Sequence, residues 1–280
     1  MGVIDLILNL VGLLLWLSWR WLGVDPLQRR TPATLVGTLR RAEPSSFKRW
    51  HLLAVLPLLV LGRAWLYCRI GPAVSWNPSL PLGPIAITFR SDLWSRMLLF
   101  SVLGLMMTLA IFYFCLLLLS LANSQEADAG PLQRFTRAHL GVIDRWPWWV
   151  KLGLPLAVTA LFWLGLQPLL TQLGIIPRTL SFWHRLEQAV VMGLASYLAW
   201  KWMLIGFLLL SLLSSYVYLG NHWFWNYAAL TGKNLLRPLG WLPLRLGKVD
   251  FAPVLAMALV VLGAEWAERG LMALYERLPL

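Results

Sequence analysis

Long apolar stretches alternate with short polar segments along the whole chain. A helix that crosses a bilayer needs about 20 mostly apolar residues. Six stretches reach that length: 3–24, 50–69, 96–122, 148–172, 187–219 and 251–273. The pattern predicts an all-α protein, a polytopic transmembrane helical bundle with six spans.

The composition agrees with a membrane protein. Hydrophobic residues make up 59% of the 280 residues and charged residues 13%, whereas a soluble domain carries about 25% charged residues. The first stretch has neither a basic leading region nor a small-residue cleavage site, so we expect a retained helix rather than a signal peptide.

Basic residues gather beside the apolar stretches, which explains the net charge of +12 by topology and anionic lipid rather than by nucleic acid. Three intervening segments are basic: 25–49, 123–147 and 220–250. The positive-inside rule predicts that they face the cytoplasm and that both termini lie outside. In the first outer segment, we expect a short amphipathic piece at Ile87–Trp94 on the membrane surface.

A seven-residue pattern, G-x-x-D-x-x-P, occurs twice, each time directly before an apolar stretch. The first copy contains Gly141, Asp144 and Pro147, and the second contains Gly247, Asp250 and Pro253. Glycine permits a turn that a side chain would hinder, and proline suits the first turn of a helix. Both copies therefore predict a helix entrance.

The aspartate of the pattern has two interpretations. It can cap the following helix, because a carboxylate accepts bonds from exposed N–H groups and complements the helix dipole. Alternatively, Asp144 and Asp250 form a partner-binding or ion-binding surface with nearby arginines, namely Arg134, Arg237 or Arg245. Duplication copies caps and sites alike, so the repetition favours neither.

Matching segments divide the chain into three repeated helical hairpins. Leu117–Leu121, with the sequence LLLSL, matches Leu208–Leu212. The hairpins predicted from such matches are 1–69, 70–172 and 173–280. The first hairpin lacks the aspartate of the pattern and reads as a degenerate repeat.

The run from Leu235 to Pro253, LLRPLGWLPLRLGKVDFAP, followed by an apolar helix, resembles the signature of the YggT family of integral membrane proteins. The resemblance covers about 100–280 and implies two repeats of helix, basic loop, motif and helix. Two features depart from the family: the extra N-terminal hairpin, and Ala252 where the family often has serine.

The resemblance implies a protein of the bacterial inner (plasma) membrane that is not an enzyme. Members of the family are linked to assembly of membrane complexes such as cytochromes, to cell division or envelope organisation, and to osmotic stress. A scaffold or assembly factor with a membrane-protein partner is therefore expected. The alternative is a transporter or channel component in osmotic or potassium homeostasis.

Polar residues within the apolar stretches bear on that choice. Lys201 lies near the middle of the fifth stretch and is a possible intramembrane polar site, although we find no acidic partner deep in another span. Arg63 is expected to snorkel to the surface. Small residues of the fifth stretch predict close helix contacts: Gly193, Ala195, Ser196 and Ala199.

The sequence predicts no catalytic residues, no cofactor and no metal site. Cys68 and Cys115 have no metal-ligand spacing. His51, His139 and His184 are not placed as a pair of haem ligands within spans. Phosphate-binding loops, nucleophile elbows and zinc-protease motifs are absent from the sequence.

Overall fold

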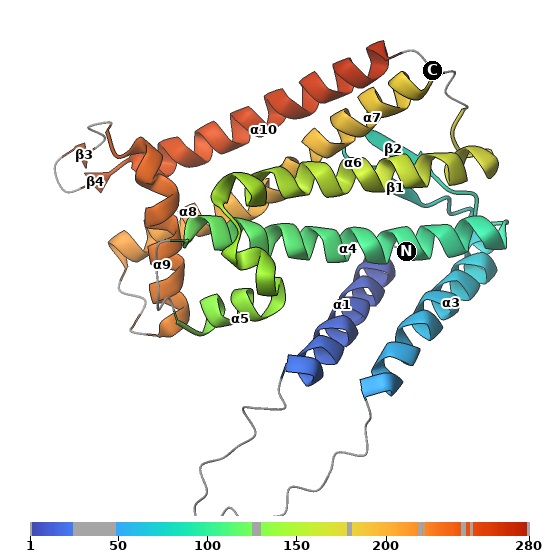
Figure 1. The fold of residues 1–280 in the computed structure, drawn as a ribbon, viewed down its shortest axis with the longest axis horizontal. Helices are drawn as coiled ribbons and strands as arrows, with labels where there is room; N and C mark the ends of the chain where they lie inside the picture. The colour runs from blue at the N-terminus through green and yellow to red at the C-terminus, as the bar shows by residue number, and fades with distance from the viewer. Residues whose placement is uncertain are drawn as a thin grey trace, which may run out of the picture. The chain divides into compact units, whose positions relative to one another are not determined.

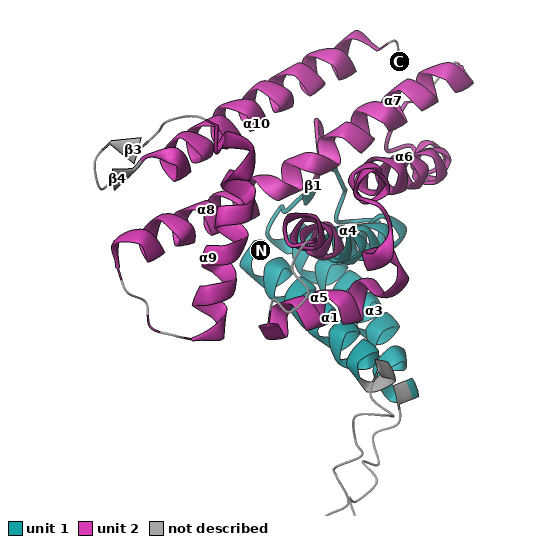
Figure 2. Cartoon of the chain, turned by 60° about the vertical axis from the view of Figure 1, so that its left-hand side comes forward, with its two compact units in different colours: residues 1–80, 88–110 teal, residues 81–87, 111–280 magenta. Residues whose placement is uncertain are grey.

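The computed structural model describes residues 2–24, 49–124, 130–177, 181–217, 220, 222–241, 245–246 and 249–278. Nearly all of them are helical, as predicted, apart from two short two-stranded sheets (Figure 1). The chain divides into two compact units (Figure 2): residues 1–80 with 88–110, and residues 81–87 with 111–280.

Unit 1 contains helices α1 (Gly2–Val24) and α3 (Arg49–Ala73), which pack together, and the first part of α4 (Trp94–Ala122). Strands β1 (Ser79–Leu82) and β2 (Ile85–Thr88) form a short sheet whose residues are shared between the units. The core of unit 1 is aromatic and aliphatic, and the rings of Tyr67 and Phe89 both contact the ring of Phe100.

Unit 2 contains the rest of α4 and the elements that follow it. These are α5 (Gly130–Leu140), η1 (Gly141–Arg145), α6 (Trp148–Gln172), α7 (Phe182–Ala195), η2 (Ser196–Trp200), α8 (Lys201–Tyr216), α9 (Trp223–Leu236), η3 (Arg237–Leu239), β3 (Arg245–Leu246), β4 (Val249–Asp250) and α10 (Ala252–Arg277). Helices α7 and α10 lie side by side (Figures 1 and 2), with Val191, Ala195 and Leu271 buried between them.

Within the described residues, five helices are long and apolar enough to cross a membrane. They are Gly2–Trp21, Trp50–Ala73, Trp94–Ala122, Trp148–Gln172 and Phe182–Tyr216. Several apolar helices are compatible with a multi-pass membrane protein. The sixth predicted stretch forms α10, which is not among the five because its second half carries charged residues such as Glu265, Glu268 and Arg269.

One expectation about local structure is wrong. Ile87–Trp94 is not an amphipathic helical piece, because β2 ends at Thr88, Phe89 is fully buried and α4 begins at Trp94. The fifth stretch contains the 3₁₀ turn η2 between α7 and α8, within the single candidate span Phe182–Tyr216. Beside this turn, Ser196 Oγ donates a hydrogen bond of 2.6 Å to the carbonyl of Gly193, a local bond that competes with regular helix.

The close helix contact predicted for the fifth stretch is confirmed at Gly193. A Cβ atom added there would lie 2.7 Å from the carbonyl oxygen of Leu156 in α6. Nearby, Tyr197 Oη donates a hydrogen bond of 2.6 Å to the carbonyl of Leu152. Helices α6 and α7 therefore meet backbone to backbone, as small residues permit within membranes.

This contact predicts opposite effects for one substitution at two glycines. Gly193→Ala should lower the free energy of unfolding by about 1 to 3 kcal/mol, because the methyl group overpacks the contact with Leu156. Gly206→Ala in α8, where nothing lies within 4 Å of the added atom, should be neutral or stabilising. Unfolding of each purified variant in a detergent titration measures the change in stability. Equal changes for the two variants would contradict the close contact at Gly193.

Candidate functional site

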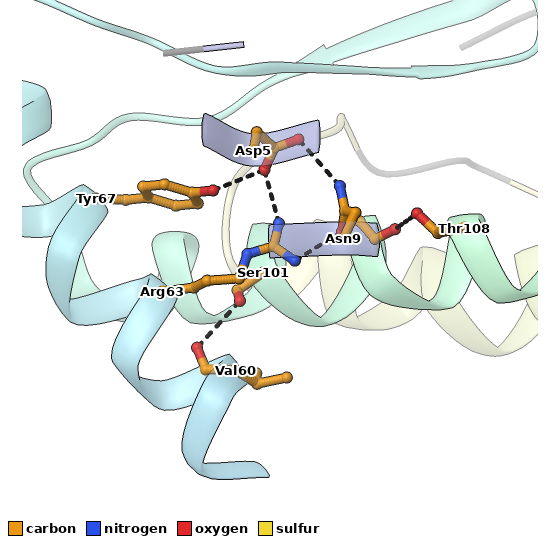
Figure 3. A network of polar contacts seen from close by, with 8 residues as sticks. Asp5, Asn9, Val60, Arg63, Tyr67, Ser101 and Thr108 are labelled. Carbon is orange, nitrogen blue, oxygen red and sulfur yellow. Dashed lines mark hydrogen bonds and ion pairs between the residues drawn. The ribbon is translucent and has the colours of Figure 1, made fainter. Parts of the chain in front are cut away.

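A network of buried polar groups joins α1 to α3 in unit 1 (Figure 3). Arg63 Nη2 donates a hydrogen bond of 2.7 Å to Asp5 Oδ1, and Arg63 Nη1 donates one of 2.7 Å to Asn9 Oδ1. Tyr67 Oη donates to the same Asp5 oxygen at 2.8 Å, and Asn9 Nδ2 donates to Asp5 Oδ2 at 3.1 Å. The carboxylate thus receives three donors, and its charge is matched by one guanidinium.

The position of this network corrects one expectation. Arg63 does not snorkel: its side chain is 1% exposed, and that of Asp5 is 23% exposed. A Cβ added to Gly104 in α4 would lie 3.3 Å from Arg63 Nη2. Gly104 is about 15 Å along α4 from its first residue, from a rise of about 1.5 Å per residue. An acid therefore pairs with a base inside the predicted spans.

The sequence carried a signal for this network. Asp5 and Asn9 are four residues apart on α1, and Arg63 and Tyr67 are four residues apart on α3. Residues at that spacing share one face of a helix. Each helix therefore carries a pair of polar residues on one of its faces. This pairing is missed when each charged residue in an apolar stretch is considered alone.

A second charged cluster surrounds Asp144 in unit 2. Ser120 Oγ donates a hydrogen bond of 2.6 Å to Asp144 Oδ1, and Lys151 Nζ donates one of 2.8 Å to Ser120 Oγ. Lys151 Nζ is 3.8 Å and Arg137 Nε is 3.5 Å from the carboxylate oxygens. Hereafter this cluster of Ser120, Arg137, Asp144 and Lys151 is called the Asp144 clamp, since it ties α4, α5, η1 and α6 together.

The clamp shows that Asp144 is not the cap of the following helix. The residue at the N-cap of α6 is Pro147, and no side chain bonds to the free N–H groups there. Asp144 instead lies within η1 and turns toward Lys151, whose side chain is 5% exposed. The cap interpretation is therefore wrong for Asp144.

The serine and lysine of the clamp do not form an activated nucleophile. Such a pair needs a lysine that accepts the hydroxyl proton, whereas Lys151 donates to Ser120 and the hydroxyl donates to Asp144. Ser120 is also 1% exposed, so a substrate has no approach to its oxygen. The hydrogen bonds through Ser120 instead hold the charged groups of Asp144 and Lys151 in fixed positions.

A neutral network lies next to the clamp, around the end of α4. Asn123 Nδ2 donates to Tyr227 Oη at 3.0 Å and to Thr231 Oγ1 at 2.9 Å, both on α9. Asn234 Nδ2 donates to Asn123 Oδ1 at 3.0 Å, and Gln133 Nε2 on α5 donates to the carbonyl of Asn123 at 3.3 Å. Burial raises the pKa of Tyr227, so its hydroxyl stays neutral.

The other residues of the two motifs are only partly brought together. Gly141 has a φ of +57°, which favours glycine. Pro253 is buried in the first turn of α10, as predicted for a helix entrance, while Arg237 in η3 is exposed. Arg245 pairs with Asp250 in the short sheet of β3 and β4. Gly247 and the side chains of Arg245 and Asp250 lie outside the described residues.

Lys201 begins α8, directly after the 3₁₀ turn η2. It lies one turn beyond Tyr197, whose hydroxyl contacts Leu152 near the start of α6. The level of Lys201 is therefore that of the first turn of α6, where Trp148 is exposed. Its Nζ lies 5.6 Å from the ring centre of Trp202, an arrangement that suits a lysine at a membrane interface.

No family model, curated protein or solved structure matches this chain. The resemblance to the YggT family therefore stays a hypothesis. The functional inference depends on the contacts of the residues described above. Within the described ranges, no group of three or more His, Cys, Asp or Glu side chains is placed to hold a metal ion.

Proposed function

We propose that this chain is a non-enzymatic, multi-pass membrane protein of the YggT type that acts as a scaffold or assembly factor for a membrane complex. In this proposal α10 is the sixth span, the spans form three hairpins, and the basic loops face the cytoplasm. The hairpins 70–172 and 173–280 are the two repeats, and the region of each motif engages a membrane-protein partner.

The observation that supports a scaffold is the internal pairing of buried charges. Arg63 binds Asp5, and Lys151 is held between Ser120 and Asp144. Each cation meets its counter-ion within the same unit and at hydrogen-bonding or ion-pair distance. Charges fixed in this way stiffen a bundle and specify its packing, whereas a moving ion needs groups that exchange partners.

The order of elements supports the two repeats. Helix α4 is followed by the short helix α5, the first motif and α6, and α8 is followed by the short helix α9, the second motif and α10. The matched serines occupy related places. Ser120 of α4 binds Asp144, and Ser211 of α8 touches α9, where a Cβ on Gly232 would meet its side chain.

Crosslinking in native membranes tests the scaffold role. We expect the wild-type chain to crosslink to a defined membrane complex, and Asp144→Asn to lose it. Asp92→Asn is the matched control, because Asp92 is a 49% exposed carboxylate in a surface ion pair. Val142→Glu probes the surface of η1 without touching the clamp, since Val142 is 71% exposed. Retention of the complex by both Asp144→Asn and Val142→Glu would refute the role of this motif.

A transporter or channel component is the second candidate, and it would require the Arg63–Asp5 pair of α1 and α3 to open and exchange partners during transport. Paired polar groups inside spans are what a transporter requires. Ion flux in liposomes separates the candidates: a scaffold gives no flux, whereas a transporter gives a flux that Arg63→Met abolishes. Lys201→Leu should not affect the function of a scaffold. A loss of partner binding in that variant, at normal abundance of the protein, would therefore count against the scaffold role.

A further inference from the structure

Exposed arginines and tryptophans surround the entrance of α6. We define the basic–aromatic surface as Arg134, Arg137, Arg145, Trp146, Trp148 and Trp149, all of which are exposed. Trp148 and Trp149 are 67% and 63% exposed. These residues come from one continuous part of the chain, which runs from α5 through η1 into α6.

The fold of α5 explains why the arginines face outward. This helix buries Gln133, Thr136 and His139, which are three residues apart and so share one face. Arg134 and Arg137 each follow a buried residue, about 100° further around the helix, and both are exposed. The tryptophans begin α6, a candidate membrane span, and aromatic residues at such positions mark the level of the lipid headgroups.

The Asp144 clamp keeps this surface positive. Asp144 is the one acidic residue in the sequence from 130 to 151, and its side chain is 17% exposed because it turns toward Ser120 and Lys151. Arg137 is partly matched by that carboxylate at 3.5 Å. Arg134 and Arg145 have no ion pair in the described part of the chain, so their charge is directed outward.

We propose that the basic–aromatic surface binds the headgroup phosphates of anionic phospholipids. Arginine recognises phosphate through charge and paired N–H donors, and the adjacent tryptophans insert at the same level of the bilayer. The binding rests on the placement of α6 in a membrane and not on the partner proposed above. Lipid binding also explains the orientation of Asp144 in the clamp, because a carboxylate that faced outward would repel the phosphates.

Native mass spectrometry of the purified full chain tests this with phosphatidylglycerol and phosphatidylcholine of identical acyl chains. The wild type should retain phosphatidylglycerol preferentially. Arg134→Gln with Arg145→Gln should weaken that binding about thirty-fold at low salt, since each basic residue near the headgroups contributes about five-fold. The wild-type preference should shrink as salt is raised.

The matched control removes two arginines that already have carboxylate neighbours, Arg90 beside Asp92 and Arg269 beside Glu265. Arg90→Gln with Arg269→Gln makes the same change in net charge and should leave the preference intact. Equal weakening in both double variants, or equal retention of the two lipids by the wild type, would overturn the proposal. So would an unchanged lipid preference together with loss of a crosslinked protein, because the surface would then bind protein.

Discussion

Replacing Arg63 with methionine should lower the free energy of unfolding by about 3 kcal/mol or more, one of the two largest effects that we expect. The substitution keeps an unbranched apolar stem but removes the guanidinium, and it leaves the Asp5 carboxylate without its counter-ion. Tyr67 and Asn9 still donate to that carboxylate, yet neither carries a charge. Unfolding of the purified chain in a detergent titration measures the loss.

The double variant Asp5→Asn, Arg63→Met separates the ion pair from simple packing. Removing both charges leaves no uncompensated ion, so the double variant should be more stable than Arg63→Met alone. Arg90→Met is the control: Arg90 is 67% exposed and pairs with Asp92, so its loss should cost no more than about 1 kcal/mol. Additive losses in the double variant would show that Asp5 and Arg63 are not coupled.

The positions of the long helices could be predicted from sequence because length and apolar composition decide them. The predicted stretches 50–69 and 96–122 lie within α3 and α4, and 148–172 coincides with α6. The break at η2 could not be predicted in this way. Its first residue, Ser196, donates a hydrogen bond to the carbonyl of Gly193, a local contact that an apolar pattern does not indicate.

Helices α5 and α9 were not predicted because the pattern considered was an apolar stretch of about 20 residues, whereas these helices have 11 and 14 residues. Helix α5 buries Gln133, Thr136 and His139, and α9 buries Thr231 and Gly232 among others. The neutral network around Asn123 explains their burial, since these polar side chains hydrogen-bond to one another rather than to water.

The candidate sites were predicted only in part, because their residues come together from separate helices. The motif drew attention to Asp144, but its partners Ser120 and Lys151 lie 24 and 7 residues away in sequence, on two other helices. Arg134 was expected to approach the aspartate, and Arg137 does so instead. Which arginine of α5 reaches the aspartate depends on the rotation of that helix, and its polar buried face sets the rotation.

Lys151→Met is the second substitution with a large expected effect, again about 3 kcal/mol of lost unfolding free energy. Lys151 is 4% exposed, so the Asp144 carboxylate would keep only Arg137, whose side chain is 42% exposed, as its counter-ion. Asp144→Asn with Lys151→Met should recover much of the loss. Lys201→Met is the control, because Lys201 is only half-buried and contacts a tryptophan ring rather than a carboxylate.

Asp144→Ser distinguishes the clamp from a helix cap. Serine and aspartate cap helices about equally well, so a cap would tolerate this change with a loss of a few tenths of a kcal/mol. The clamp predicts a far larger loss, because serine cannot match the charge of Lys151 and leaves that buried ammonium without a counter-ion. Retained stability in Asp144→Ser would rule out the clamp. A loss as large as that of Lys151→Met would establish that the two charges stabilise the chain as one unit.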